Sequence, residues 1–424
     1  MPPLPIPDWS PRQFFELAEI YSQRVAEAAP GFVATVAKWR PEDLIPGLSD
    51  IDTRIVAQEM SPEEWMALDQ VISDVHLDLV RERPEWSRKL EHEPGYCLTP
   101  EEAFDPLLYQ AEMAHWSFYY GDQEFIIQVR EHMRGQPWEL RDELHHLKRW
   151  LMFWGPYNRE IDPPINVALP IEPKYALHSR AMHYFVPSLQ AALSLVSRRT
   201  VHGKREALYR WLESFPQERV LNETAHMLEV HYGVAALEDR EELFSYEDRC
   251  YAFLRRIAPQ VLDVVTAVQL PKNGDIDQAM ALLRAGMGAL RVNPLSGVYN
   301  GLRGSRPRRA RYWLYLKAPE HFATDWLIRN EVGFLQRNFT HYTWAAYAAL
   351  RWGEPDLPLD ELLARAQPNP LSREEAKLVA EMFAIAERTK ESSMARQALQ
   401  EAAECYADYY AVLDKIYRDA RQRV

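Results

Sequence analysis

The chain is 424 residues long, roughly three times the usual length of a domain, which predicts two or three compact units. Hydrophobic residues make up 47% of it and charged residues 26%, a composition that excludes a disordered or fibrous protein. Because the net charge of -13 repels phosphate backbones, we expect no nucleic-acid partner.

Three features predict a cytoplasmic location. No stretch approaches the roughly 18 uninterrupted apolar residues that a bilayer-spanning helix needs, so we expect no membrane partner. Cys97, Cys250 and Cys405 lie far apart and support neither a disulfide framework nor a zinc site. The start of the chain has no basic segment followed by an apolar core, so it does not match a secretory signal.

Helix-start signals recur along the chain. Capping boxes, in which a hydroxyl accepts a helix-end N–H and a Glu or Gln three residues later reaches back, begin at Ser10, Ser61, Thr99 and Ser372. After Ser61 the apolar residues recur at helical spacing, which predicts an amphipathic helix that ends near Val80.

Strands are predicted between the first helices. Two short β-like runs, 31–36 and 51–56, are separated by a turn-rich stretch, and the aromatic run 116–120 is a third candidate. Helical patterns dominate the rest of the chain, at about 177–198, 204–214, 220–235, 246–268, 372–390 and 393–422.

We therefore predict an α+β fold class with three domains. A small mixed β-sheet domain spans 1–165, a predominantly α-helical bundle spans 166–270, and a helical C-terminal extension spans 271–424. A proline-rich connector at 162–173 is the main boundary. The long C-terminal helices are candidates for the contact of a homodimer.

Asp50 and Asp52 are the main candidates for functional residues. Side chains alternate along a strand with period two, so two Asp at i and i+2 point to the same side of a sheet. Both carboxylates can therefore hold one metal ion, and hard oxygen ligands of this kind suit Mg²⁺. A divalent ion there neutralises a triphosphate and aligns an attacking oxygen, as phosphoryl-type transfer requires.

The run from Gly47 to Val56, with Ser49 directly before the two acids, resembles the nucleotidyltransferase-fold superfamily of polymerase-β-like enzymes. It is most similar to the antibiotic-modifying branch, the aminoglycoside nucleotidyltransferase-like proteins. A looser resemblance lies at 200–208, a basic turn that leads into a helix, as in the helical domain behind many of these catalytic domains. The resemblance implies a mixed-sheet nucleotidyltransferase domain, and we expect its active site in the cleft between that domain and the helical bundle. It also implies Mg²⁺ and a nucleoside triphosphate, with ATP the expected one.

The resemblance assigns roles to single residues. It implies metal ligation by Asp50 and Asp52 and nucleotide contacts by Ser49 and Lys204. It also implies a third acid from a later strand, for which Asp122 is the candidate, although a turn Asp following a Gly explains that residue equally well.

One part of the family pattern is missing. Members carry Gly-Ser at the turn after the first strand, where this chain has Ala37-Lys38-Trp39. Either Lys38 holds phosphate by its charge, or nucleotide binding is altered, or the domain has lost transferase activity.

The expected function is transfer of a nucleoside monophosphate to a hydroxyl, or in a close variant a carboxylate, of a small molecule, with release of pyrophosphate. Such chemistry serves antibiotic modification or biosynthesis, and the acidic surface suits a cationic acceptor. No single residue stands out as the general base.

Two alternatives remain open. A degenerate nucleotidyltransferase domain would bind a nucleotide or serve as a scaffold without catalysis. A di-iron oxidase would use Glu-x-x-His pairs, which share a helix face, at Glu112/His115, Glu143/His146 and Glu223/His226. Separately, the basic run 303–311 is interpreted as a solvated loop, with a phosphate grip as the alternative.

Overall fold

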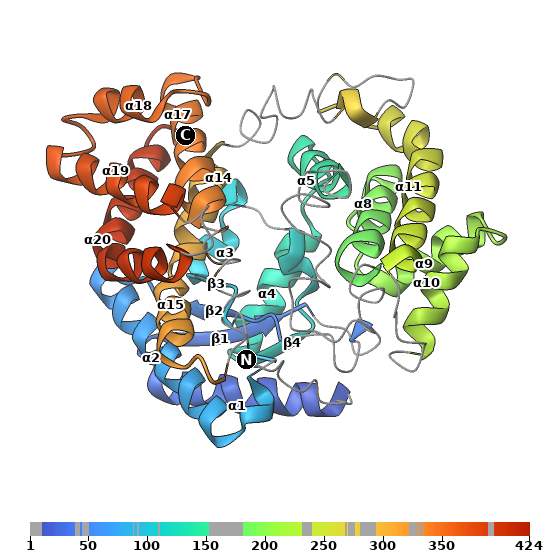
Figure 1. Ribbon diagram of the computed structural model, residues 1–424, viewed down its shortest axis with the longest axis horizontal. Coiled ribbons are helices and arrows are strands. Elements are labelled where there is room, and N and C mark those ends of the chain that lie inside the picture. Colours follow the sequence, from blue (N-terminus) through green and yellow to red (C-terminus); the bar gives the residue numbers. More distant parts are fainter. Residues whose placement is uncertain are drawn as a thin grey trace. The chain divides into compact units, whose positions relative to one another are not determined.

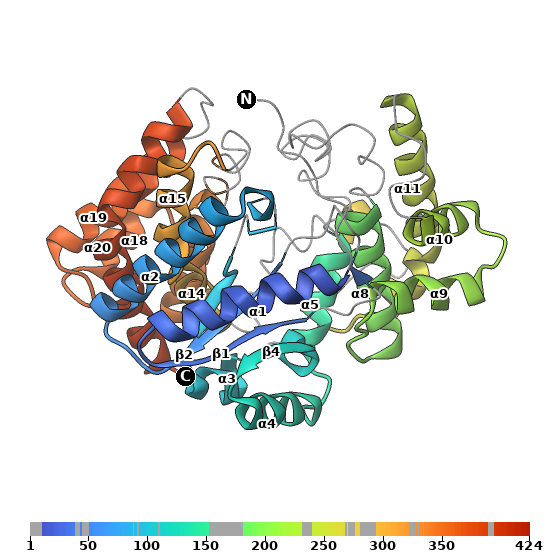
Figure 2. The same ribbon diagram turned by 90° about the horizontal axis from the view of Figure 1, so that it is seen from below.

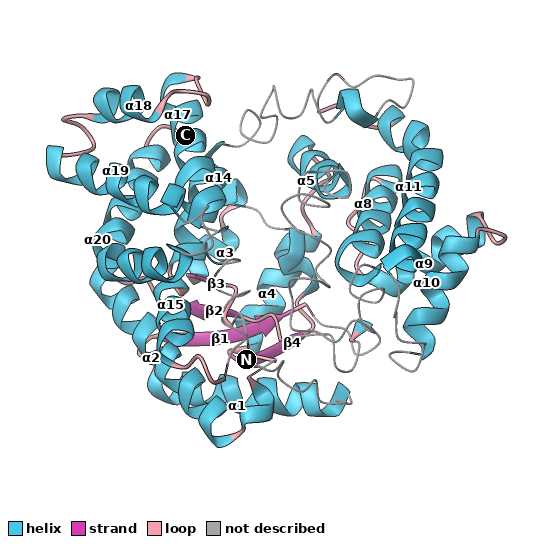
Figure 3. Ribbon diagram, viewed as in Figure 1, coloured by secondary structure: helices cyan, strands magenta, loops and turns pink. Residues whose placement is uncertain are grey.

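The computed structural model of the chain describes residues 11–38, 43, 44, 51–87, 89, 90, 93–108, 111–151, 181–230, 240–267, 269, 276–279, 294–321, 328, 331, 333, 335–388 and 394–424. These residues form a mostly helical α+β fold that contains a four-stranded mixed sheet (Figure 1 and Figure 3). The predicted fold class is confirmed at this level. Of the helices described, none combines the length and the apolar character that crossing a bilayer requires.

The chain divides into two compact units, and each is discontinuous in the sequence. The sheet unit combines Phe14–Lys38, Asp50–Gly135 and Asn293–Val424. The helical unit combines Met1–Gln13, Trp39–Ser49 and Gln136–Val292. The three predicted domains, in contrast, are continuous stretches, so they group the residues differently.

The sheet has the order β3-β2-β1-β4. Strand β1 pairs antiparallel with β2 and with β4, whereas β2 and β3 are parallel and are joined through helix α2 (Pro62–Glu82). The strands are β1 (Phe32–Ala37), β2 (Arg54–Ala57), β3 (Tyr96–Leu98) and β4 (Phe118–Gly121). The three predicted strands are confirmed with shifted bounds, but β3 was missed because three residues carry no readable alternation.

The pairing register sets which side chains share a face. Arg54 lies opposite Val36 of β1 and opposite Tyr96 of β3, so these three residues point to the same side of the sheet. On that side Val36 and Tyr96 belong to a buried hydrophobic cluster that includes residues of α3 (Pro100–Phe104) and α4 (Gln123–Arg134). Figure 2 shows α1 (Pro11–Ala28) and α2 on the opposite side of the sheet.

Local capping chemistry explains where several helices begin. The Ser61 hydroxyl accepts the Glu64 N–H at 3.2 Å, and the Glu64 carboxylate accepts the Ser61 N–H at 2.7 Å, so α2 begins with the predicted capping box. The boxes at Thr99 and Ser372 form in the same way. The box predicted at Ser10 lies outside the described residues.

The C-terminal helices belong to the sheet unit. Helix α14 packs against α17, β3 and α20, and α15 packs against α2. These helices are α14 (Pro294–Ser305), α15 (Arg308–Lys317), α17 (Thr343–Trp352), α18 (Leu359–Ala366), α19 (Arg373–Arg388) and α20 (Ala395–Arg421), with a π-helical segment η10 (Leu335–Tyr342). Short 3-10 segments of the same unit are η2 (Pro84–Trp86), η3 (Pro106–Leu108) and η4 (Ala111–His115).

The basic run 303–311 is not a solvated loop, and that interpretation is wrong. It forms the end of α14 and the start of α15, and Arg306, Arg308 and Arg311 are each 3% exposed. Arg306 makes two hydrogen bonds to the Glu102 carboxylate at 2.6 and 2.8 Å, and Arg308 pairs with Glu331 at 2.6 Å. The buried pairing of these arginines could not be predicted from the local sequence, because their partners Glu102 and Glu331 lie far away along the chain.

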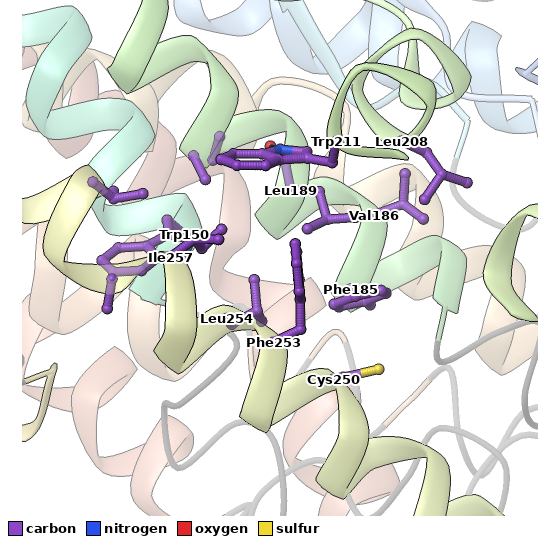
Figure 4. Close-up of a cluster of buried hydrophobic side chains, with 14 of the residues drawn as sticks. Trp150, Phe185, Val186, Leu189, Leu208, Trp211, Cys250, Phe253, Leu254 and Ile257 are labelled. Atoms are coloured by element: carbon purple, nitrogen blue, oxygen red, sulfur yellow. The ribbon is translucent and has the colours of Figure 1, made fainter. Parts of the chain in front are cut away.

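The helical unit contains its own core. Trp150, Phe185, Trp211 and Phe253 pack together in it, as Figure 4 shows. Its helices are α5 (Leu140–Leu151), the π-helical segment η8 (Ala181–Phe185), α8 (Val186–Ser197), α9 (Lys204–Ser214), α10 (Arg219–Val230) and α11 (Arg240–Asp263). The helices predicted at 177–198, 204–214, 220–235 and 246–268 are confirmed, with shifted bounds, within the described residues; 177–180 and 231–235 lie outside them.

Candidate functional site

The candidate site lies where the chain enters β2. Asp52 precedes this strand, and its side chain is 48% exposed, so its carboxylate is accessible to a ligand. Asp50 and Ser49 lie outside the described residues. Because Asp52 and Arg54 are two residues apart on extended chain, they share one face of the sheet.

The segment before β3 fixes the backbone on which Asp52 stands. The N–H of Ile51 donates to the carbonyl of Lys89 at 3.0 Å, and the N–H of Gly95 donates to the carbonyl of Thr53 at 2.8 Å. The N–H of Thr53 donates to the buried Glu93 carboxylate at 2.6 Å, and the Thr53 hydroxyl bonds the same oxygen. Asp52 thus projects from a backbone that is hydrogen-bonded on both sides of it.

Arg54 holds the Asp52 carboxylate. Its Nη1 lies 2.5 Å from Asp52 Oδ1 and 2.5 Å from the Asp52 carbonyl oxygen. Its guanidinium lies 5.0 Å from the ring centroid of Tyr96, and the residue is only 6% exposed. Burying a guanidinium is costly unless it is paired and hydrogen-bonded, and these contacts supply that compensation.

Close packing beside this pair requires a glycine. A Cβ on Gly95 would lie 3.3 Å from Asp52 Oδ1 and 3.4 Å from Arg54 Nη1, tighter than most real Cβ contacts. The absence of a side chain at Gly95 therefore lets the segment approach the carboxylate without displacing it.

Arg54 and Tyr96 are the residues near Asp52 that sequence reasoning missed. The guanidinium of Arg303, on α14, lies 3.9 Å from the same Tyr96 ring centroid. Arg54 had a signal, because it follows Asp52 by two residues and so shares its face. Tyr96 had none, and Arg303 lies in the basic run 303–311, for which a phosphate grip was the alternative interpretation. Only strand pairing and helix packing bring Tyr96 and Arg303 to this place.

Lys38 lies at the same end of the sheet as Asp52. It is exposed and directly follows β1, and the pairing of Val36 with Arg54 puts the end of β1 beside the start of β2. The structure therefore brings together two of the predicted site residues, one cationic and one anionic. The prediction that Lys38 contacts phosphate is compatible with this place.

Asp122 lies at the other end of β1. The Asp122 N–H donates to the carbonyl of Val33, near the start of β1, at 3.0 Å. Asp52 lies near the end of β1, because it precedes Arg54 by two residues and Arg54 pairs with Val36. At about 3.3 Å per residue along a strand, the two acids are separated by more than roughly 10 Å and do not converge on one ion. Asp122 instead begins α4, where its carboxylate accepts the N–H of Phe125 at 2.9 Å.

Lys204 belongs to the helical unit and begins α9. Its backbone N–H and that of Arg205 each donate to the Asp43 carboxylate at 3.1 Å. A helix N-terminus favours an anion, and here the chain's own carboxylate takes that place. A nucleotide contact by Lys204 remains a prediction that concerns its side chain.

Three members of the predicted Glu-x-x-His pairs, Glu143, His146 and Glu223, are engaged in other contacts, whereas the side chain of Glu112 lies outside the described residues. The Glu143 carboxylate accepts the Ala267 N–H at 2.9 Å, and the Glu223 carboxylate pairs with Arg219 at 2.7 Å and Arg249 at 2.9 Å. His146 stacks on Trp138 with ring centroids 5.5 Å apart, and burial holds its pKa well below the usual range.

No group of three or more His, Cys, Asp or Glu side chains among the described residues is placed to hold a metal ion. Asp50 is not one of those residues, so the predicted pair of acids is represented by Asp52 alone. The half-exposed Asp52 carboxylate, on a fixed backbone, fits one ligand of a magnesium ion.

Comparison with known proteins yields no match, whether with family models, with curated proteins or with solved structures.

Proposed function

We propose that this chain is a magnesium-dependent nucleotidyltransferase that moves a nucleoside monophosphate from a nucleoside triphosphate to an oxygen of a small molecule. The observation that carries the proposal is the half-exposed Asp52 carboxylate at the start of β2, beside the exposed Lys38 at the end of β1. The mixed sheet and the resemblance from Gly47 to Val56 support it further.

Asp52, together with Asp50, would hold the magnesium ion, which when bound supplies charge neutralisation for the triphosphate. Arg54 orients Asp52 by its hydrogen bonds to the side chain and to the main chain of that residue. Lys38 adds a positive charge at the same end of the sheet, where it attracts a phosphate.

In the proposed reaction an acceptor oxygen attacks the α-phosphorus and forms a new P–O bond. The bond from the α-phosphorus to the bridging oxygen of the β-phosphate breaks, and pyrophosphate leaves with that electron pair. The acceptor loses its proton to a base that the described residues do not identify. The net charge of -13 favours a cationic acceptor, such as an amino sugar, in diffusional encounter.

A second candidate function is nucleotide binding without transfer. It is favoured by Lys38 and Trp39 at the place of the family's Gly-Ser turn and by the engagement of Asp52 with Arg54. Both functions share the site, so the same experiment separates them.

The test is a pyrophosphate-release assay with Mg²⁺, the four common nucleoside triphosphates, and panels of amino-sugar and carboxylate acceptors. In Asp52→Asn and Asp50→Asn we expect turnover to fall by at least about a hundredfold, the size of effect seen when one group that stabilises transition-state charge is removed. The matched control is Asp78→Asn, an exposed acid on α2, which should keep full activity.

Full activity in both site variants would remove their metal role. Magnesium-dependent nucleotide binding without pyrophosphate release from any acceptor would favour the second candidate.

A further inference from the structure

Glu93 is a buried carboxylate that is bonded to the residue directly after Asp52. Glu93 and Thr53 are both fully buried. Oε2 of Glu93 accepts the N–H of Thr53 at 2.6 Å and also accepts the Thr53 hydroxyl. A buried carboxylate needs hydrogen-bond donors to compensate for its lost solvation, and Thr53 supplies two of them. These bonds attach the segment before β3 to the chain that enters β2.

The bond from the Thr53 N–H fixes the peptide group that follows Asp52. A peptide group is planar, so the Thr53 N–H and the Asp52 carbonyl move as one body. Glu93 holds this group at its N–H, and Nη1 of Arg54 holds it at its carbonyl oxygen, 2.5 Å away. The backbone dihedral at Asp52 is therefore restrained, which limits the directions in which its side chain can point.

The segment that carries Glu93 is itself anchored. The carbonyl of Pro94 accepts a hydrogen bond from Arg311 of α15, and the N–H of Gly95 donates to the carbonyl of Thr53 at 2.8 Å. Glu93 thus reaches Thr53 from a segment that a helix of the same unit holds in place.

Asp52 reaches solvent between two buried residues. Ile51 and Thr53 are each 0% exposed, whereas the Asp52 side chain is 48% exposed. A carboxylate on a restrained backbone loses less conformational entropy when it takes up a metal ion. Groups that orient a metal-binding side chain typically contribute about tenfold to a hundredfold to metal affinity.

We propose that Glu93 is a positioning residue for Asp52. Through Thr53 it fixes the main chain from which the Asp52 carboxylate binds the metal ion. This inference rests on the proposed function and adds to its site a residue that acts without touching the nucleotide.

The test measures Mn²⁺ binding to the full chain by electron paramagnetic resonance, with Mn²⁺ in place of Mg²⁺ because both ions take oxygen ligands. Glu93→Leu removes the acceptor, and we expect the dissociation constant for Mn²⁺ to rise by about tenfold to a hundredfold. Thr53→Val removes one of the two donors and should raise it by about tenfold. Both variants break the same bond, so their effects in the double variant should be less than additive.

Two conservative variants and two controls separate positioning from general stability. Glu93→Gln keeps an acceptor and Thr53→Ser keeps the hydroxyl, so both should bind Mn²⁺ more tightly than Glu93→Leu and Thr53→Val do. Thr35→Val makes the same change at another buried position of the sheet and should leave Mn²⁺ binding unaltered. Glu102→Gln disrupts a buried pair with Arg306 and should lower thermal stability without weakening Mn²⁺ binding.

Mn²⁺ binding that is lost in Asp52→Asn but unchanged in Glu93→Leu and Thr53→Val would overturn the positioning role and leave the proposed metal site standing. Thr53→Val decides alone if Glu93→Leu does not fold. Equal weakening in Glu102→Gln would also overturn the role, because loss of stability would then explain both effects.

The same measurements separate this inference from the transferase. If Mn²⁺ binding depends on Asp52 and on Glu93 but no acceptor releases pyrophosphate, the positioning role stands and the transferase falls. If Asp52→Asn binds Mn²⁺ as tightly as the wild type does, the metal role of Asp52 is wrong and both proposals fall.

Discussion

Asp69 is a single buried carboxyl whose protonation is coupled to folding. It is 1% exposed on α2, and burial raises its pKa from 3.8 to about 8. The Ala310 N–H donates to the Asp69 carboxylate at 3.0 Å, and Arg309 lies 3.6 Å from it. These two contacts and the charge of Arg311 favour the ionised form, but the loss of solvation on burial is the larger effect and favours the neutral form. The folded protein therefore keeps this proton over a pH range in which the unfolded chain has lost it.

This coupling predicts a pH-dependent loss of stability. Between pH 4 and about pH 8 the native state binds more protons at Asp69 than the unfolded state does, so the free energy of unfolding falls as pH rises. Asp69→Asn stays neutral and still accepts the Ala310 N–H. From pH 5 to 8 we expect the stability of the variant relative to wild type to rise by up to about 4 kcal/mol.

Urea unfolding at several pH values measures this difference. Asp74→Asn, at an exposed position of the same helix, is the control and should show no such trend. A difference between Asp69→Asn and wild type that stays constant with pH would contradict the shifted pKa.

Asp122 has a local structural role, as the N-cap of helix α4, that requires no catalytic function. Gly121 ends β4 at φ +104°, where a Cβ would lie 2.4 Å from the Val33 carbonyl oxygen, and Asp122 then caps the helix. Both the turn and the cap are local, and they account for the Gly-Asp pair at this point in the sequence.

The cap predicts distinct outcomes for two substitutions of Asp122. Asn is as good an N-cap as Asp, so Asp122→Asn should keep both stability and transferase activity. Asp122→Ala loses the bond to Phe125 and should cost about 1 kcal/mol of unfolding free energy. Thermal unfolding and pyrophosphate release measure the two properties separately, and loss of activity in a stable Asp122→Asn would restore a catalytic role.

The sheet unit depends on a charge pair that joins distant segments. Arg306, at the end of α14, is buried against Glu102 of α3, and its guanidinium lies 4.2 Å from the Trp65 ring centroid of α2. Removing one partner of a buried pair leaves the other charge without compensation, which is more costly than breaking an exposed pair.

Glu102→Gln should therefore destabilise the protein by about 3–5 kcal/mol, measured by urea unfolding. Glu375→Gln is a closely matched control, because both glutamates close a capping box but Glu375 pairs with the half-exposed Lys415. Its cost should stay below about 1 kcal/mol. Equal losses in the two variants would show that the caps, and not the buried pair, carry the effect.

Features that depend on residues close together in the sequence could be predicted from the sequence alone. The capping boxes at Ser61, Thr99 and Ser372 and the helix after Ser61 are confirmed because each bond or contact joins residues a few positions apart. The common face of Asp52 and Arg54 follows from strand geometry in the same way.

Long-range pairing and packing decided the rest. The register separates Asp52 from Asp122, the parallel pairing of β2 with β3 puts Tyr96 beside Arg54, and the docking of α14 adds Arg303 to that ring. The buried basic run and the return of the C-terminal helices to the sheet unit have the same origin. Such contacts join residues that are far apart in the sequence, so local propensity does not predict them. They contribute free energy only when the whole unit folds and its segments pack in one core.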